Sequence, residues 1–273
     1  MTQFSLRSSN GLSLIVCEPI EAAGFRNAFS TRQGGVSNLP VASLSLGNFV
    51  QDRRDAVLEN RRRFRTAIGA SEWPLITVRQ VHSVDVCLVL DKFEFEREPP
   101  TCDALVSDLE NTLLAVQTAD CIPILIADPR TRAFAAVHAG WRGTLNGIVA
   151  RTIERMQQEF HVRPEDLLIA VGPAIGSCCF EVGMDVVELF SGEFEYAGEL
   201  MAPNGREGKV QLDLNLANFK QLVAIGVEPD KIYDSRLCTS CRKDLFFSYR
   251  RDRGRENPVG RLMGVIGRDI RKL

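Results

Sequence analysis

With 273 residues, of which 45% are apolar and 25% charged, the chain has the composition of an ordinary globular protein and can bury a core without disulfide bonds. The net charge of -2 gives no electrostatic case for binding to nucleic acid or to an acidic membrane, so we expect neither partner. The N-terminal stretch lacks the apolar core of a signal peptide, and no run is long enough to span a bilayer. We therefore predict a cytoplasmic protein whose eight cysteines are thiols, metal ligands or catalytic groups.

The first half of the chain alternates strand-like runs with turns. We predict a strand pair around Gly11, then a glycine-rich loop over Ser30–Ser37 that carries Arg32. Apolar residues at helical spacing predict a helix over Asp52–Gly69. Further on, the pattern predicts two strands within Trp73–Leu90 with His82 between them, a charged loop over 91–103, and strands over Ala104–Val106 and Thr112–Val116.

The second half begins with the stretch Gln117–Gly147, which reads as strand, turn, strand and a glycine-rich start of a helix. That helix is predicted over Thr144–Phe160. The remaining pattern predicts a buried strand that runs into a glycine–proline turn within 167–176, a helix at 184–190, a loop at 191–209, and a short strand or turn over Gln211–Leu214. It then predicts a helix over Asn215–Ile225, and a strand, basic loop and strand within 246–267. No internal repeat or break in composition marks a boundary, so we predict one mixed α/β domain over residues 1–273.

One cysteine and two histidines beside apolar runs are the candidates for the chemistry. A catalytic zinc takes three protein ligands and keeps one open position, and His82, Cys121 and His138 supply that number and suitable types. Each lies where an apolar strand meets polar or glycine residues, which is where ligand sites open in α/β sheets. Residue types and spacing alone leave an alternative open, in which the histidines are structural and Cys121 is a small buried hydrophobe.

A candidate anion site follows His138. Arg142, Gly143 and Thr144 lie at a glycine-rich helix start, where free backbone amides and a guanidinium suit a phosphate, although a plain tight turn explains the glycines equally well. Gln80 and Asp120 adjoin the proposed ligands and could orient them or contact substrate.

The remaining histidine and the C-x-x-C pair are left out of this site. His161 follows a predicted helix end, where we expect a surface residue or a C-terminal cap. Cys238 and Cys241 lack a second C-x-x-C, and Cys178 and Cys179 are adjacent rather than spaced for one metal, so we expect ordinary thiols at all four.

Three motifs, VRQVHS, QTADCIPILIAD and AVHAGWRGT, together resemble the YfiH/LACC family, and further blocks such as VGPAIGSCCFEVG and CTSC…FFSYRRD follow in matching order. The resemblance implies a layered α/β/β/α sandwich like that of cytotoxic necrotizing factor and of YfiH-type cysteine hydrolases. It implies that His82, Cys121 and His138 hold a catalytic Zn²⁺, and that Arg32 contacts phosphate or substrate. The final basic loop looks longer than the family's, which leaves the contacts of Arg253, Arg255 and Arg261 open.

The implied activity is that of a purine nucleoside phosphorylase, which converts adenosine, inosine, guanosine and methylthioadenosine to the base and ribose 1-phosphate, with adenosine deamination beside it. In the resulting hypothesis, zinc polarises phosphate or water at its open position. The partners are then a small nucleoside and phosphate, and the protein is a monomer or homodimer.

Three other functions stay open at this point. Cys121 and His138 could instead form the nucleophile and base of a cysteine hydrolase, such as one that edits the peptidoglycan precursor UDP-MurNAc-L-Ser. A polyphenol oxidase would need Cu²⁺, which the same ligands could take, but three histidines cannot supply a trinuclear copper cluster. A non-catalytic zinc site would need a fourth protein ligand, for which Cys102 and Cys178 are candidates.

Overall fold

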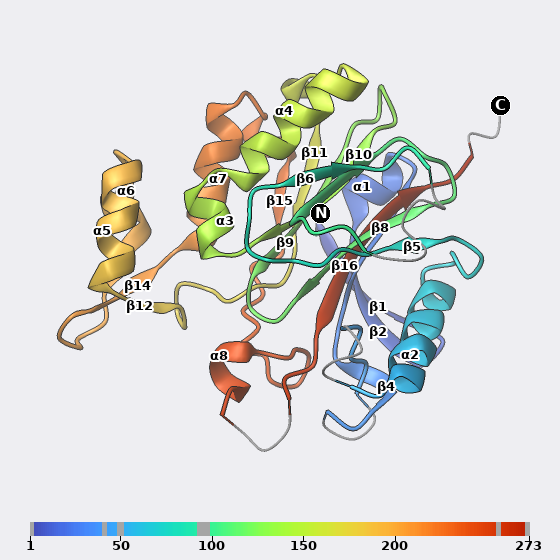
Figure 1. Ribbon diagram of the computed structural model, residues 1–273, viewed down its shortest axis with the longest axis horizontal. Coiled ribbons are helices and arrows are strands. Elements are labelled where there is room, and N and C mark those ends of the chain that lie inside the picture. The colour runs from blue at the N-terminus through green and yellow to red at the C-terminus, as the bar shows by residue number, and fades with distance from the viewer. Residues whose placement is uncertain (1–2, 40–42, 48–51, 92–98, 255–257, 271–273) are drawn as a thin grey trace.

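The backbone forms four layers in the order helix, sheet, sheet, helix (Figure 1). The computed structural model describes residues 3–39, 43–47, 52–91, 99–254 and 258–270. Arg255 and residues 92–98, which belong to two of the predicted loops, lie outside the described residues. The layered α/β/β/α class predicted above is confirmed.

The first sheet combines the N-terminal strands with the last strand of the chain. Among the described residues its order is β1 (Phe4–Ser9), β2 (Leu12–Cys17), β3 (Phe25–Ser30), β16 (Leu262–Arg268), β8 (Leu113–Thr118) and β5 (Leu75–Ile76). All neighbours are antiparallel except β5 and β8. On the outer face, Phe64 of α2 (Arg54–Ala67) packs among Leu14, Ala115 and Val265. β4 (Gln33–Ser37) lies against α2 and β2.

The second sheet carries the candidate chemistry. Its order within the described chain is β15 (Ile232–Asp234), β11 (Leu168–Val171), β9 (Ile122–Ala127), β10 (Phe134–Ala139), β7 (Ala104–Ser107) and β6 (Val86–Leu88). Helices α4 (Ile148–Phe160) and α7 (Leu214–Ala224) cover its outer face, where Figure 1 shows them side by side. Because both faces of β9 and β10 are buried, these strands are continuous apolar runs rather than alternating ones.

The two sheets share a core that is rich in phenylalanine. Alternate residues of each strand point to opposite faces, so Leu125 of β9 faces the first sheet whereas Ile124 faces the helices. Phe25, Phe29 and Phe134 are at most 2% exposed in the layer between the sheets. The rings of Phe25 and Phe134 meet edge to face with their centroids 6.2 Å apart.

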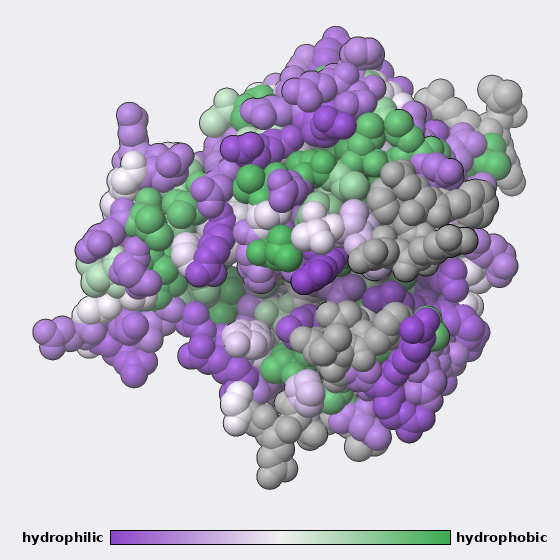
Figure 2. All heavy atoms as spheres, viewed as in Figure 1, coloured by the Kyte–Doolittle hydropathy of each residue, from purple (hydrophilic) through white to green (hydrophobic). Residues whose placement is uncertain are grey.

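A small lobe extends from the helix side of the second sheet. It contains a sheet of β12 (Glu181–Gly183), β14 (Lys209–Leu212) and β13 (Met201–Pro203), with α5 (Met184–Glu193) and α6 (Ala197–Leu200). Figure 2 shows apolar surface on this lobe, where Met184 and Leu189 of α5 are exposed. The remaining helices of the described residues are short: α1 (Glu18–Ala22), α3 (Trp141–Leu145), α8 (Tyr249–Asp252), η1 (Pro164–Asp166) and η2 (Pro229–Lys231). None of the described helices is long and apolar enough to cross a membrane.

Several sequence-based elements need correction. The predicted loop at Ser30–Ser37 contains strand β4. The predicted helix at 144–160 is two helices, α3 and α4, because Gly147 between them adopts a left-handed conformation with a φ of 75°. The loop predicted at 191–209 contains α6 and β13, and the strand expected near 246 is irregular chain before α8, which Ser248 caps.

Candidate active site

The three predicted ligands meet at one end of the second sheet. His138 lies near the end of β10, Cys121 directly precedes β9, and His82 lies in the loop between β5 and β6. The ligand atoms of the three side chains all lie within 4.8 Å of one another. The Cys121 Sγ is 3.7 Å from His82 Nε2, and the two imidazole rings are nearly perpendicular with centroids 5.0 Å apart.

Asp103, at the start of β7, organises both histidines. The antiparallel register of β7 and β10 pairs Val137 with Ala104, which puts His138 beside Asp103. His138 Nδ1 donates to Asp103 Oδ1 at 2.8 Å, and this leaves Nε2 for the site. The same carboxylate accepts the backbone amides of residues 81, 82 and 83 at 2.7–3.1 Å. His82 has a positive φ of 62°, and these bonds hold its loop in that uncommon conformation.

Gly140 provides the space in which the ligands meet. The β9–β10 register pairs Ala139 with Ile122, so the next residues toward the site are Gly140 and Cys121. A Cβ on Gly140 would lie 2.7 Å from His82 Cδ2 and 3.2 Å from Cys121 Sγ. The φ of Gly140 is -75°, which any residue can adopt, so the requirement for glycine here is one of space alone.

The charged groups of the site stabilise one another's ionised forms. Burial raises the pKa of the Cys121 thiol, but the charge of His138 and hydrogen bonds from both histidines outweigh burial and lower it to about 6. Burial lowers the pKa of His138, but the Cys121 charge and the Asp103 hydrogen bond raise it to about 9. Burial raises the pKa of Asp103, yet the bonds from His138 and the Ser83 amide lower it to about 2. Without a metal, the site therefore holds a thiolate and an imidazolium at neutral pH.

The donor set fits a metal ion with an open position. Zinc bonds of about 2.0–2.1 Å to nitrogen and about 2.3 Å to sulfur place tetrahedral ligands about 3.6 Å apart. The Cys121–His82 separation of 3.7 Å agrees with that value. Within the described chain, no fourth cysteine, histidine or carboxylate joins the three, and Cys102 and Cys178 are not part of this group.

Gln80 and Asp120 lie beside the ligands but use their polar groups within the protein. Gln80 pairs its side-chain amide with the backbone of Gln117, at 2.7 Å and 2.8 Å. Asp120 accepts hydrogen bonds from Thr239 Oγ1 at 2.6 Å, from Ser248 Oγ at 3.1 Å and from the Arg250 amide at 2.6 Å. Both arrangements position the backbone next to His82 and Cys121.

The predicted phosphate contacts differ in their surroundings. Thr144 is buried, its amide donates to the Gly140 carbonyl and its hydroxyl accepts from Asn218, so Thr144 faces the protein. Gly143 is buried within α3. Arg142 is exposed, with its guanidinium carbon 4.2 Å from the Trp141 ring centroid.

Arg32 stacks over the Phe247 ring at 4.9 Å and donates to the Lys243 carbonyl. It therefore lies against the loop that follows the C-x-x-C segment.

One residue important to this geometry, Asp103, escaped the sequence analysis, and the contacts of another, Arg261, were left open there. Asp103 could have been noticed as an acidic residue directly before a short, mostly apolar strand, but its partner became visible only with the β7–β10 pairing. Arg261 lies near Cys121 and Asp120: burial lowers the pKa of its guanidinium, and their negative charges partly offset that effect.

Comparison with known proteins agrees with these motifs. The family model described as multi-copper polyphenol oxidoreductase laccase matches residues 26–269. The chain belongs to this family, which is the YfiH/LACC family. In the crystal structure of YlmD from Geobacillus stearothermophilus, the backbone matches 99% of this chain and 100% of that one, with a TM-score of 0.88 and 36% identity.

The relatives of this YfiH/LACC chain carry enzyme names. The Geobacillus stearothermophilus protein named purine nucleoside phosphorylase YlmD is 38% identical over 90% of this chain and 91% of its own length. A protein of an unknown prokaryotic organism, named adenosine deaminase RL5, is 35% identical over 82% of this chain and 88% of its own length. The chain is thus an enzyme, and these two relatives are named for activities on purine nucleosides.

Proposed function

We propose that this enzyme is a zinc-dependent purine nucleoside phosphorylase with an adenosine deaminase side activity. Its substrates are adenosine, inosine, guanosine or methylthioadenosine together with phosphate. The observation that carries the proposal is the gathering of His82, Cys121 and His138 within 4.8 Å beside an orienting carboxylate, in a chain whose relatives bear phosphorylase and deaminase names. Zinc held by these three residues would supply a Lewis acid that polarises an oxygen of phosphate or water.

The protein's own groups prepare the site for an anionic reactant. Asp103 fixes the ring of His138 so that Nε2 faces Cys121, and three backbone amides keep Asp103 ionised. Arg261, near Cys121, contributes positive charge, and Arg142 and Arg32 are further candidates to hold phosphate by charged hydrogen bonds. Because Thr144 faces the protein, we assign it a structural part and place the phosphate contacts on the arginines.

The proposed reaction exchanges one bond for another. An oxygen of phosphate forms a bond to ribose C1′ while the bond from C1′ to N9 of the purine breaks. The base leaves with the bonding electrons and takes up a proton. The deaminase side reaction instead adds water at C6 of adenosine and releases ammonia. The site must therefore accept either phosphate or water beside the bound nucleoside.

Product analysis tests the proposal. Purified protein is incubated with inosine and with adenosine, with and without phosphate, and the products are identified by mass. We expect hypoxanthine and ribose 1-phosphate from inosine only when phosphate is present, and inosine from adenosine without phosphate. Free ribose as the product in the presence of phosphate would contradict phosphorolysis.

A second function is favoured by one specific observation. Cys121, His138 and Asp103 form a chain of thiol, imidazole and carboxylate, which is the arrangement of a cysteine hydrolase. Such an enzyme would hydrolyse an amide or a precursor such as UDP-MurNAc-L-Ser. Chelation separates the two functions, because metal removal stops a zinc enzyme, whereas it leaves a thiol nucleophile free to react and sensitive to iodoacetamide.

Three further properties belong to the same proposal. We place the protein in the cytoplasm because its eight cysteines, all within the described residues, form no disulfide, as a reducing compartment favours. We treat residues 1–273 as one domain because β3, near the N-terminus, and β16, near the C-terminus, are neighbours in one sheet. The small size of the proposed substrates is compatible with either a monomer or a homodimer.

A further inference from the structure

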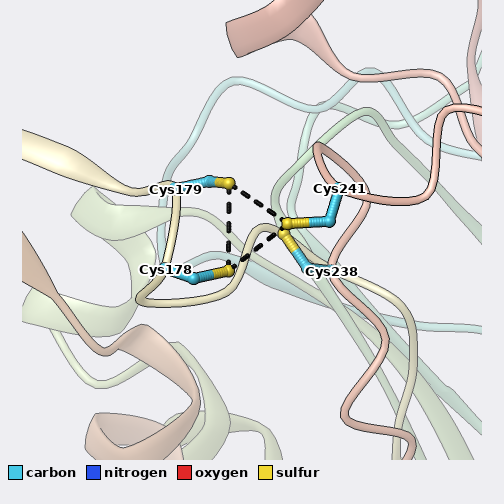
Figure 3. A group of neighbouring side chains, drawn as sticks. All are labelled: Cys178, Cys179, Cys238 and Cys241. Atoms are coloured by element: carbon cyan, nitrogen blue, oxygen red, sulfur yellow. Dashed lines mark hydrogen bonds between the residues drawn. The ribbon is translucent and has the colours of Figure 1, made fainter.

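We propose that Cys178, Cys179, Cys238 and Cys241 bind a second zinc ion in a closed site of four thiolates, separate from the candidate active site. The sequence favoured ordinary thiols, because one pair is adjacent and the other has C-x-x-C spacing. The structure brings the four sulfurs together, all within 4.8 Å of one another (Figure 3).

The sulfur separations match a tetrahedral zinc site. Zinc–sulfur bonds of about 2.3 Å place the sulfurs of a tetrahedral site about 3.8 Å apart. The structure has separations of 3.8 Å between Cys178 and Cys179, 3.6 Å between Cys178 and Cys241, and 3.4 Å between Cys179 and Cys241. All four are free thiols, and Figure 3 shows their sulfurs pointing toward one another from two loops.

The two loops are built to hold this cluster. The chain turns tightly after β11, where the Cys179 and Phe180 amides both donate to the Gly176 carbonyl, at 2.9 Å and 3.0 Å. The Gly176 amide donates to Cys238 Sγ at 3.3 Å, a contact that is typical of thiolates bound to zinc. A Cβ on Gly176 would lie 3.3 Å from Cys178 Sγ and 3.4 Å from Cys238 Cβ, so glycine leaves room for the sulfurs.

Four protein ligands leave no open position, so the second ion has a structural rather than a catalytic part. It would tie together segments about sixty residues apart in the chain. This cross-link reaches the active site directly, because Thr239, between Cys238 and Cys241, donates to Asp120, the residue before Cys121. Ile175, on the other loop, donates its amide to the Asp120 carbonyl at 2.8 Å. The second zinc therefore fixes the backbone that presents Cys121.

Metal content and ligand type test this inference. Protein purified under reducing conditions without chelator should contain two zinc ions per chain. The double variant Cys238→Ser/Cys241→Ser should contain one, and Cys87→Ser, which alters a half-buried thiol of β6, should keep two. A double variant that binds as much zinc as the wild-type chain would overturn the inference.

X-ray absorption of the variant His82→Ala keeps the test decisive if the cysteine variants fail to fold. This variant should lose the active-site metal and retain one zinc ion with four sulfur ligands at about 2.3 Å. Nitrogen or oxygen ligands, or no zinc at all, would refute the four-thiolate site. The mass of the unreduced wild-type chain gives a further readout, since a loss of two or four hydrogens would identify disulfides instead of a metal site.

Discussion

Asp103 Oδ1 lies 2.8 Å from His138 Nδ1, and the same carboxylate holds the backbone of the loop that carries His82. One buried acidic residue, which is not itself part of the three-residue ligand group, thus sets the orientation of two of the candidate ligands. Because β7 and β10 are not consecutive strands, this relationship arises only when the sheet forms. Asp103 therefore links the pairing of β7 with β10 to the orientation of the candidate ligands.

The variant Asp103→Asn tests whether this carboxylate orients the ligands. It removes the negative charge that stabilises the protonated ring of His138. It also replaces the carboxylate that accepts hydrogen bonds from the backbone amides of residues 81–83 with a neutral, weaker acceptor. Loss of a carboxylate partner of this kind typically costs about 10- to 100-fold in metal affinity or activity. Zinc titration and nucleoside turnover measure the effect. The matched control Asp85→Asn, an exposed position in the same region, should leave both unchanged.

Gly140→Ala tests the need for space. The added Cβ would lie 2.7 Å from the His82 ring, so the ligands must move apart and metal affinity should fall at least tenfold. The midpoint of thermal unfolding should change little, because the backbone conformation of Gly140 is one that alanine also adopts. Gly192→Ala in α5 is the control, since nothing lies within 4 Å of its added Cβ. We expect this control to keep full metal content and to gain about 0.5–1 kcal/mol in stability. Equal metal content in the two variants would rule out the steric argument.

The pH dependence of thiol reactivity tests the electrostatics. A thiol reacts as its thiolate, and the pKa of Cys121 is lowered to about 6, so the thiolate is present above that pH and is lost as the pH falls through it. In metal-free protein, the rate of Cys121 alkylation by iodoacetamide should reach half its maximum near pH 6. Peptide mass mapping assigns the label to Cys121, and bound zinc should protect it. A midpoint near pH 9 would show that His138 does not stabilise the thiolate.

The core between the sheets provides a test of the fold itself. Phe134 is fully buried there against Phe25, so Phe134→Ala should lower the free energy of unfolding by about 3–5 kcal/mol. Urea denaturation measures the change. Leu6→Ala in β1 is the control, because Leu6 is 60% exposed and its truncation should cost well under 1 kcal/mol.

The sequence predicted those features that depend on local pattern. Helix α2 and strands such as β9 and β10 follow from periodicity and apolar runs, and the layered class was confirmed together with the family resemblance. The break at Gly147 was missed because the apolar pattern continues through it, and only the left-handed backbone separates α3 from α4.

At the site, residue type and position at strand ends made His82, Cys121 and His138 candidates, and the family resemblance supported the choice. The parts played by Asp103, Gly140 and the four-cysteine cluster depend on pairing between distant segments. Cys178 and Cys241, for example, are 63 positions apart, and no spacing rule relates an adjacent pair to a C-x-x-C. For Asp120, the place beside Cys121 left two parts open, orienting that ligand or contacting substrate. The fold surrounds its carboxylate with protein donors, which favours the first.

The most direct test of the central claim is metal-dependent phosphorolysis at the three-residue site. Protein stripped of metal is titrated with zinc while hypoxanthine and ribose 1-phosphate formed from inosine and phosphate are measured, in parallel with His82→Ala. We predict that activity is absent without metal, returns with zinc in the wild-type chain, and does not return in the variant. Full turnover by the metal-free protein, or by His82→Ala, would contradict the account.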